Sequence, residues 1–200
     1  MKTINNKTHA LFTGRTLFSM MLVITAVFVA AAMMSPRQAI AASAAEIDRE
    51  VDAALQKLYA GTPAAKELSK VAKGILMFPD VLKGGFIVGG QYGAGALRED
   101  NKTVGYYKTV AASYGLQAGA QKFGYAMFLI TDSALEYLKK SKGWEIGVGP
   151  SIVVVDAGLA KSLTTTTAKE DIYAFFFGQK GLMAGLGLQG SKISRIHPDK

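Results

Sequence analysis

The residue types that most often carry out catalysis, cysteine, histidine and paired carboxylates, are rare or scattered in this sequence. The chain has no cysteine, and outside its first 41 residues it has one histidine, His197. Without cysteine there is no disulfide, thiolate nucleophile or cysteine-based metal site, and a Ser-His-Asp arrangement would have to be built from the tail. The carboxylates are scattered, as in Glu99-Asp100 and Glu170-Asp171, which is typical of solvated charges rather than paired acid-base groups. We therefore expect no enzymatic activity, no metal and no cofactor.

One string, Gly185 to Gly190, fits the pattern G-x-G-x-x-G. A dinucleotide site needs a strand before this string, a helix after it and an acid about 20 residues later. The residues that follow, 192–196, have the pattern of a strand instead. The string therefore does not predict a nucleotide site.

Lysines are the most suggestive charged residues. Lys66, Lys70 and Lys73 stand at i, i+4 and i+7, so they would share one face of a predicted helix, with Lys83 in the loop beyond it. Such a face could contact phosphate head groups, where each surface lysine adds about 1 kcal/mol toward an anionic membrane. A solvated helix side is the alternative. The predicted lipid-binding residues are these four lysines.

Glycine and glutamine recur with the two-residue period of a strand in three segments. The residues that fall on one face are Gly89, Gln91, Gly93 and Gly95 in the first segment, Gly115, Gln117, Gly119 and Gln121 in the second, and Gly185, Gly187 and Gln189 in the third. A glycine-lined face permits close packing or sharp bending of a sheet. It could also form a smooth groove for an acyl chain, with the glutamines orienting a polar head, or a surface for self-association.

Helix signals flank a long region of strand signals. Ser43 to Glu46 has the form of a capping box, which predicts a helix ending at Gly61, and Thr62-Pro63 opens a second helix running to Gly74. A third helix is expected at about 132–141. The predicted strands are 75–78, 86–97, 103–110, 113–121, 123–130, 144–148, 152–155, 172–177, 182–188 and 192–196.

These elements predict an α+β fold in which the N-terminal helices pack on a mainly antiparallel, strongly twisted, glycine-rich sheet, as a sandwich or a partly closed barrel. The apolar segment 77–82 contains Pro79. It is expected to be a buried strand followed by a turn, and a loop that inserts into a bilayer is the alternative.

The first 41 residues have the pattern of a secretory signal. Lys2, Lys7 and Arg15 precede an uncharged apolar run, 17–34, and Ala39-Ile40-Ala41 supplies a cleavage pattern. An uncleaved membrane anchor is the alternative. The remaining residues, 42–200, have the length of a single domain and carry 19 basic and 15 acidic residues, a net charge of +4. This charge suits weak attraction to an anionic surface and does not predict a nucleic-acid binder.

Three long phrases carry a family resemblance: KGILMFPDVLKGGFIVGGQYGAGAL at 73–97, GLQAGAQKFGYAMFLITDSAL at 115–135 and KGLMAGLGLQGSKI at 180–193. With them the chain resembles the SYLF family of lipid-binding domains from about residue 55 to residue 196. Eukaryotic relatives are associated with phosphoinositide and membrane binding, and some with actin. The resemblance implies an exported bacterial member, for which actin is a poor partner, and implies membrane attachment through the N-terminal helices, 46–73.

The sequence thus predicts a periplasmic or secreted, membrane-associated protein that binds anionic phospholipid through Lys66, Lys70, Lys73 and Lys83. The alternatives are a structural envelope protein, including a small outer-membrane barrel, or a protein-interaction module. Two capped helices and non-alternating apolar runs disfavour the barrel. A hydrolase is disfavoured by the histidine and cysteine inventory. The sequence does not indicate which lipid is bound or what the oligomeric state is.

Overall fold

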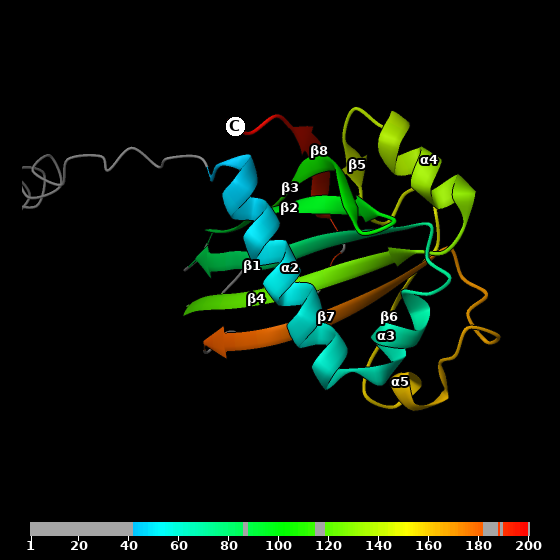
Figure 1. Ribbon diagram of the computed structural model, residues 1–200. Coiled ribbons are helices and arrows are strands. Elements are labelled where there is room, and N and C mark those ends of the chain that lie inside the picture. The colour runs from blue at the N-terminus through cyan, green and yellow to red at the C-terminus, as the bar shows by residue number, and fades with distance from the viewer. Residues whose placement is uncertain (1–41, 86–87, 115–118, 182–187, 189, 200) are drawn as a thin grey trace, which may run out of the picture. The chain divides into compact units, whose positions relative to one another are not determined.

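A computed structural model describes residues 42–85, 88–114, 119–181, 188 and 190–199, all within one compact unit, Ala41–Lys200. Two helices precede a sheet, and two more helices lie between later strands (Figure 1). The helices are α2 (Ala44–Gly61), α3 (Pro63–Leu68), α4 (Asp132–Lys140) and α5 (Leu159–Ser162). The strands are β1 (Gly74–Gly85), β2 (Val88–Glu99), β3 (Lys102–Tyr114), β4 (Gly119–Leu129), β5 (Trp144–Glu145), β6 (Ile152–Val154), β7 (Ile172–Gly181) and β8 (Lys192–Ile196).

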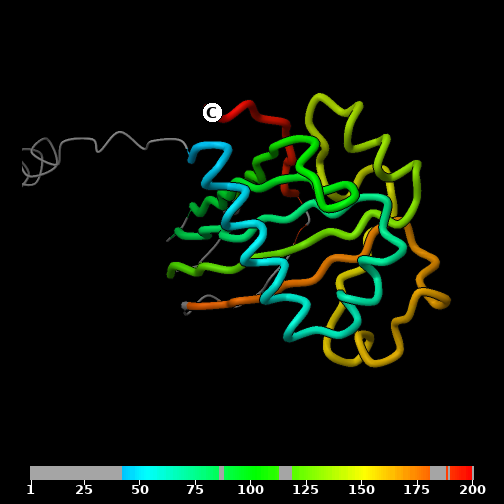
Figure 2. The backbone as a smooth tube through the Cα atoms, viewed as in Figure 1, coloured from blue at the N-terminus to red at the C-terminus, as the bar shows by residue number. Residues whose placement is uncertain are grey.

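All eight described strands join one sheet in the order β5-β8-β3-β2-β1-β4-β7-β6. The neighbours are antiparallel except β6 and β7, which are parallel. The sheet curls strongly into a half-barrel, and α2 crosses one face of it (Figure 1). The start of α2 lies beside the end of the chain, where the Ala44 amide donates to the Asp199 carbonyl over 2.9 Å (Figure 2). The predicted α+β fold is confirmed.

Local sequence signals predict both ends of α2 but not the end of the next helix. The Ser43 side chain accepts from the Glu46 amide at 3.2 Å, and α2 ends at Gly61 as predicted. The second helix was expected to reach Gly74, which is wrong because α3 ends at Leu68. After it the chain turns and joins the sheet, where the Lys73 amide donates to the Leu129 carbonyl over 2.8 Å. Sheet pairing therefore overrides helix continuation.

Strand β1 runs through Pro79 instead of ending in a turn after Phe78. Between Met77 and Asp80 it holds one more residue than β2, so the strand contains a bulge. Proline has no amide to donate, so a bulge is where an interior strand tolerates it. The segment is buried through Val81 apart from exposed Asp80. Burial of this segment was predicted, and the turn was wrong.

The bulge reverses the side-chain alternation of β1. Before it, Leu76 and Phe78 point into the half-barrel, and after it Val81 does so. Glycines on both neighbouring strands leave space for the bulge. A Cβ at Gly95 of β2 would collide with the Met77 carbonyl oxygen, and one at Gly124 of β4 would lie 2.6 Å from the Pro79 carbonyl oxygen. These positions therefore require glycine.

Several other strand boundaries also differ from prediction. Strand β3 extends to Tyr114 because its alanines 111 and 112 pair with Gln91 and Gly90 of β2, so residues 113–121 are not one strand. Strand β5 is two residues long, since Gly147 and Gly149 have positive φ and turn the chain. Strand β7 reaches Gly181, and α5 was not predicted. Of the predicted strand 182–188, only Leu188 is a described residue.

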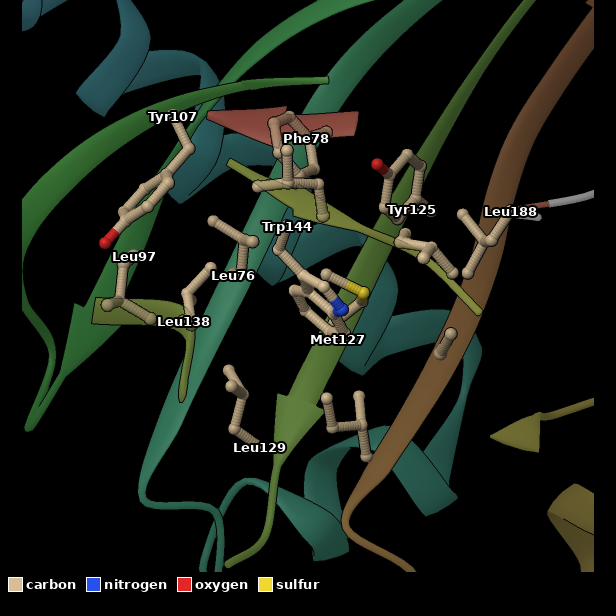
Figure 3. Close-up of a cluster of buried hydrophobic side chains, with 14 of the residues drawn as sticks. Leu76, Phe78, Leu97, Tyr107, Tyr125, Met127, Leu129, Leu138, Trp144 and Leu188 are labelled. Carbon is tan, nitrogen blue, oxygen red and sulfur yellow. The ribbon is translucent and has the colours of Figure 1, made fainter. Parts of the chain in front are cut away.

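Two apolar layers lie on opposite faces of the sheet. The layer inside the half-barrel gathers Leu76, Phe78, Tyr125 and Met127 with α4 and Trp144 (Figure 3). The outer layer packs α2 and α3 on the outer face of the sheet. Its sheet residues include Met77, Ala96, Ala126, Phe128 and Phe175. The predicted packing of the leading helices on the sheet is confirmed.

Candidate functional site

Three of the four predicted lysines border one cleft. Lys66 lies in the last turn of α3, Lys70 in the turn after it, and Lys73 just before β1. Together with Tyr59 and Arg98 they line a cleft between α2, α3 and the adjoining ends of β1 and β2. The prediction that the lysines share one helix face is wrong because the helix stops at Leu68. The fold nevertheless brings them together; we call this site the lysine cleft.

The charges of the lysine cleft are only partly neutralised. Lys70 Nζ lies 2.7 Å from Glu67 Oε1, and Lys73 Nζ lies 3.4 Å from Asp132 Oδ2. Both pairs are exposed, and such pairs contribute about 0–1 kcal/mol, so the amines can exchange these partners for phosphate oxygens. Lys66 forms no ion pair within the described part of the chain. The cleft therefore presents positive charge to an incoming anion.

Arg98 has a structural task at the same cleft. Its Nη2 lies 2.7 Å from Asp52 Oδ1 and donates to the Asp48 carbonyl at 3.2 Å. The side chain is 10% exposed. Arg98 therefore ties α2 to the end of β2, and the lysines remain the groups with freedom to bind a ligand.

The structure does not bring Lys83 to the lysine cleft. It lies ten residues after Lys73 along β1, a separation of roughly 30 Å at the rise of a strand. It stands opposite Gln91 of β2 and Gln121 of β4. The lysine predicted to lie in a loop is thus a residue of the central strands.

The glycine-glutamine face of β2 points into the half-barrel. A Cβ at Gly93 would lie 2.7 Å from Val81 Cγ2, so Gly93 is closely packed as Gly95 is. Gly89 is half-buried, and Gly119 is exposed at the start of β4. Gly115, Gln117, Gly185, Gly187 and Gln189 lie outside the described residues. Gly93 and Gly95 therefore accommodate the neighbouring strand β1, and the glutamines supply the polar groups of this face where it is described.

Buried polar side chains gather where this face ends. Gln91 and Gln121 are 6% and 7% exposed, and Thr109 is fully buried beside the Tyr125 hydroxyl. Burial raises the pKa of Tyr125 above its ordinary value. Within the described residues, neither Gln91 Nε2 nor Gln121 Oε1 has a hydrogen-bond partner. Neutral amides and hydroxyls of this kind donate and accept hydrogen bonds but supply no nucleophile or base at neutral pH.

The carboxylate of Asp171 has a shifted pKa and structural partners. The Thr131 hydroxyl and the Ser151 amide hold the pKa of Asp171 below its usual range, at contacts of 2.8 and 3.1 Å that tie the start of α4 and the residue before β6 to the residue before β7. His197 is exposed after β8. The described residues contain no group of three metal-ligating side chains, and none of the described helices has the length and apolar character to span a membrane.

Comparison with known proteins gives one family match. Residues 110–197 match the family described as Ysc84: Las17-binding protein actin regulator. The matched segment runs from Val110 of β3 past the end of β8, so it includes β4, α4 and β7 and excludes the lysine cleft. None of the curated proteins in the comparison matches the chain. The family match agrees with the SYLF resemblance of the sequence.

Proposed function

Since residues 110–197 carry the SYLF (Ysc84) domain, we propose that this protein binds anionic phospholipid at a membrane surface without chemical turnover. The observation that carries the proposal is the gathering of Lys66, Lys70 and Lys73 around one cleft. The matched family is described by what it binds and regulates, which favours a binding function over a reaction.

Lysine suits this task for a physical reason. Each lysine near a membrane surface contributes about 1 kcal/mol of attraction to anionic lipid. Lys70 and Lys73 must first leave Glu67 and Asp132, so three lysines should contribute less than the full sum, roughly 2 kcal/mol. That is enough for a weak, salt-sensitive attachment, in which additional contacts would set the affinity.

We also propose that the protein works outside the cytoplasm, in the periplasm or as a secreted protein associated with a membrane. The support is the secretory pattern of the first 41 residues. The description of the matched family names actin, but an exported bacterial protein would not meet a cytoplasmic filament. Lipid is therefore the proposed partner.

Flotation with lipid vesicles tests the proposal. Residues 42–200 are used because they contain both apolar layers of the compact unit and lack the apolar run 17–34, which would itself associate with lipid. We expect binding to vesicles containing anionic phospholipid, weakening with added salt, and little binding to neutral vesicles. Failure to bind any vesicle would overturn the proposal and direct attention to a protein partner.

A charge-matched pair of variants tests the lysine cleft itself. Changing Lys66, Lys70 and Lys73 to glutamate should lower the vesicle partition coefficient at least tenfold, since each charge near the surface contributes about 1 kcal/mol. The control changes Lys140, Lys142 and Lys169 to glutamate. These lysines lie away from the cleft, so the control alters the net charge equally. Equal losses in both variants would show that only net charge matters.

A further inference from the structure

A row of side chains crosses the outer face of the sheet beyond α2. Strands β1, β4 and β7 extend past the helix on the left of Figure 1. In register, Leu82 of β1 stands between Tyr92 of β2 and Lys122 of β4. The row continues to Val110 of β3 and Lys192 of β8 on one side and to Lys180 of β7 on the other. We call Lys180, Lys122, Leu82, Tyr92, Val110 and Lys192 the bare row.

The apolar centre of the bare row is open to solvent. Leu82, Tyr92 and Val110 are 61%, 54% and 40% exposed. A groove crosses five strands at this place, and the small residues Gly84, Gly90, Ala111 and Ala120 contribute to its lining. Adjacent large apolar side chains on a smooth surface are typical of an interaction site rather than of an ordinary solvated sheet.

The flanks of the bare row are positively charged. Lys122 and Lys180 stand directly opposite each other on neighbouring strands, an arrangement that destabilises a sheet. Asp80 lies 2.7 Å from Lys122, and Glu145 stands opposite Lys192. No ion pair joins Lys180 or Lys192 to an acid within the described residues. Residues 81–97 and 102–131 contain no acid at all, so positive charge prevails around the apolar centre.

We propose that the bare row is a membrane-docking surface that inserts Leu82, Tyr92 and Val110 into the head-group region of an anionic phospholipid bilayer. This inference rests on the proposed function and gives it a second contact surface, at the opposite end of β1 from the lysine cleft. Tyrosine with aliphatic neighbours suits the boundary between head groups and acyl chains, and the flanking lysines meet lipid phosphates.

The charges favour a bilayer over a second copy of this chain. Two bare rows brought face to face would oppose lysine with lysine at their ends, which is unfavourable. An anionic bilayer satisfies the lysines and the apolar centre together. The sequence pattern does not predict this surface, because the bulge at Pro79 sets the face on which Leu82 emerges.

Fluorescent probes test insertion directly. The chain lacks cysteine, so Leu82→Cys and Val104→Cys can each be labelled with NBD at one site. Val104 is the control because it is exposed to the same extent as Val110 but lies near the other end of β3. With vesicles containing phosphatidylglycerol, we expect a blue shift and quenching by spin-labelled lipid at residue 82, and neither at residue 104.

A substitution series measures the contribution to binding. The variant carrying Leu82→Thr, Tyr92→Thr and Val110→Thr should partition into the same vesicles at least tenfold less than the parent, with an unchanged thermal midpoint because the residues are exposed. The control carries Val104→Thr, Val148→Thr and Val154→Thr at three other exposed sites and should bind as the parent does.

The outcomes separate the inference from the proposed function. A parent protein that binds vesicles while the residue-82 probe stays in water, or while the triple variant binds normally, overturns the inference alone. A parent that binds no vesicle overturns both. A blue shift at residue 82 that grows with protein concentration without vesicles identifies a second copy as the occupant and also overturns the inference.

Discussion

Two rows of residues cross the outer face of the same six strands and meet different environments. The bare row has a counterpart under α2, which we call the covered row. From β7 to β8 its members are Phe175, Ala126, Met77, Ala96, Tyr106 and Ile196. All of them belong to or pack against the outer apolar layer, and Met77, Ala96 and Ala126 are fully buried. No member of the bare row packs in that layer.

The two rows differ in side-chain size and in charge at their ends. The covered row has alanines beside Met77, which let the helix approach, and apolar or aromatic residues at its ends. The bare row has large side chains at its centre and lysines at its ends. The row covered by α2 has small residues beneath the helix. A row suited to a membrane interface instead has charged residues around an apolar centre. Apolar character alone does not separate the two.

The largest effect that separates the rows is on folding stability. Met77→Ala and Leu82→Ala change residues of the same strand that face the same side. Met77 is fully buried and Leu82 is 61% exposed. We expect Met77→Ala to lower the free energy of unfolding by about 3 kcal/mol and Leu82→Ala by less than about 0.5 kcal/mol, in urea denaturation with equal m-values. A comparable loss in both would mean that the bare row is covered in the isolated protein.

The next effect concerns the contact that holds α2 on the covered row. Asp48 of α2 accepts from the Thr103 hydroxyl at 2.6 Å and from the Tyr106 hydroxyl at 2.8 Å. Asp48→Ala leaves these donors without their acceptor and should cost about 1–3 kcal/mol. Asp52→Ala removes an exposed partner of Arg98 and should cost about 0–1 kcal/mol. If the two variants unfold at the same urea concentration, Asp48 does not anchor the helix.

Local patterns predicted part of this arrangement. The capping box at Ser43 predicted where α2 begins, and the two-residue period of β2 placed Gln91, Gly93 and Gly95 on one face of the strand. The pattern did not show whether this face or the opposite one would be covered, because that depends on where α2 crosses the sheet. The glycine pattern likewise could not show that Gly95 and Gly124, far apart in sequence, flank one bulge.

The lysines show why the site was harder to predict than the fold. Lys66, Lys70 and Lys73 were correctly placed near one another, but for the wrong reason, since the helix ends before the second of them. Lys83 was wrongly predicted to lie in a loop because Pro79 indicates a turn in the sequence. In the structure β1 continues through Pro79 by pairing with β2 and β4. Such pairing joins residues far apart in sequence, so the spacing of residues within one segment does not predict it.

The smallest effect lies at the boundary between the two rows, where Glu50 of α2 shares a pocket with Lys122 and Lys180. Burial, followed by the charge of Asp80, raises the pKa of Glu50. A raised pKa means that its contribution to stability is present below the ordinary glutamate pKa and is lost as pH rises through the raised value. Glu50→Gln should therefore flatten the pH dependence of Tm between pH 4 and 7 and raise Tm at pH 7 by about 1 °C.

Removing this carboxylate should also favour the bare row as a docking surface. One less negative charge beside Lys122 and Lys180 should increase binding to anionic vesicles by roughly two- to fivefold. Glu136→Gln is the control, because Lys140 lowers the pKa of Glu136 and its contribution is instead lost as pH falls through the lowered value. Glu136 lies on α4, away from both rows, so its loss should leave vesicle binding unchanged. Equal vesicle binding by the two variants would show that the boundary charge does not act on the bare row.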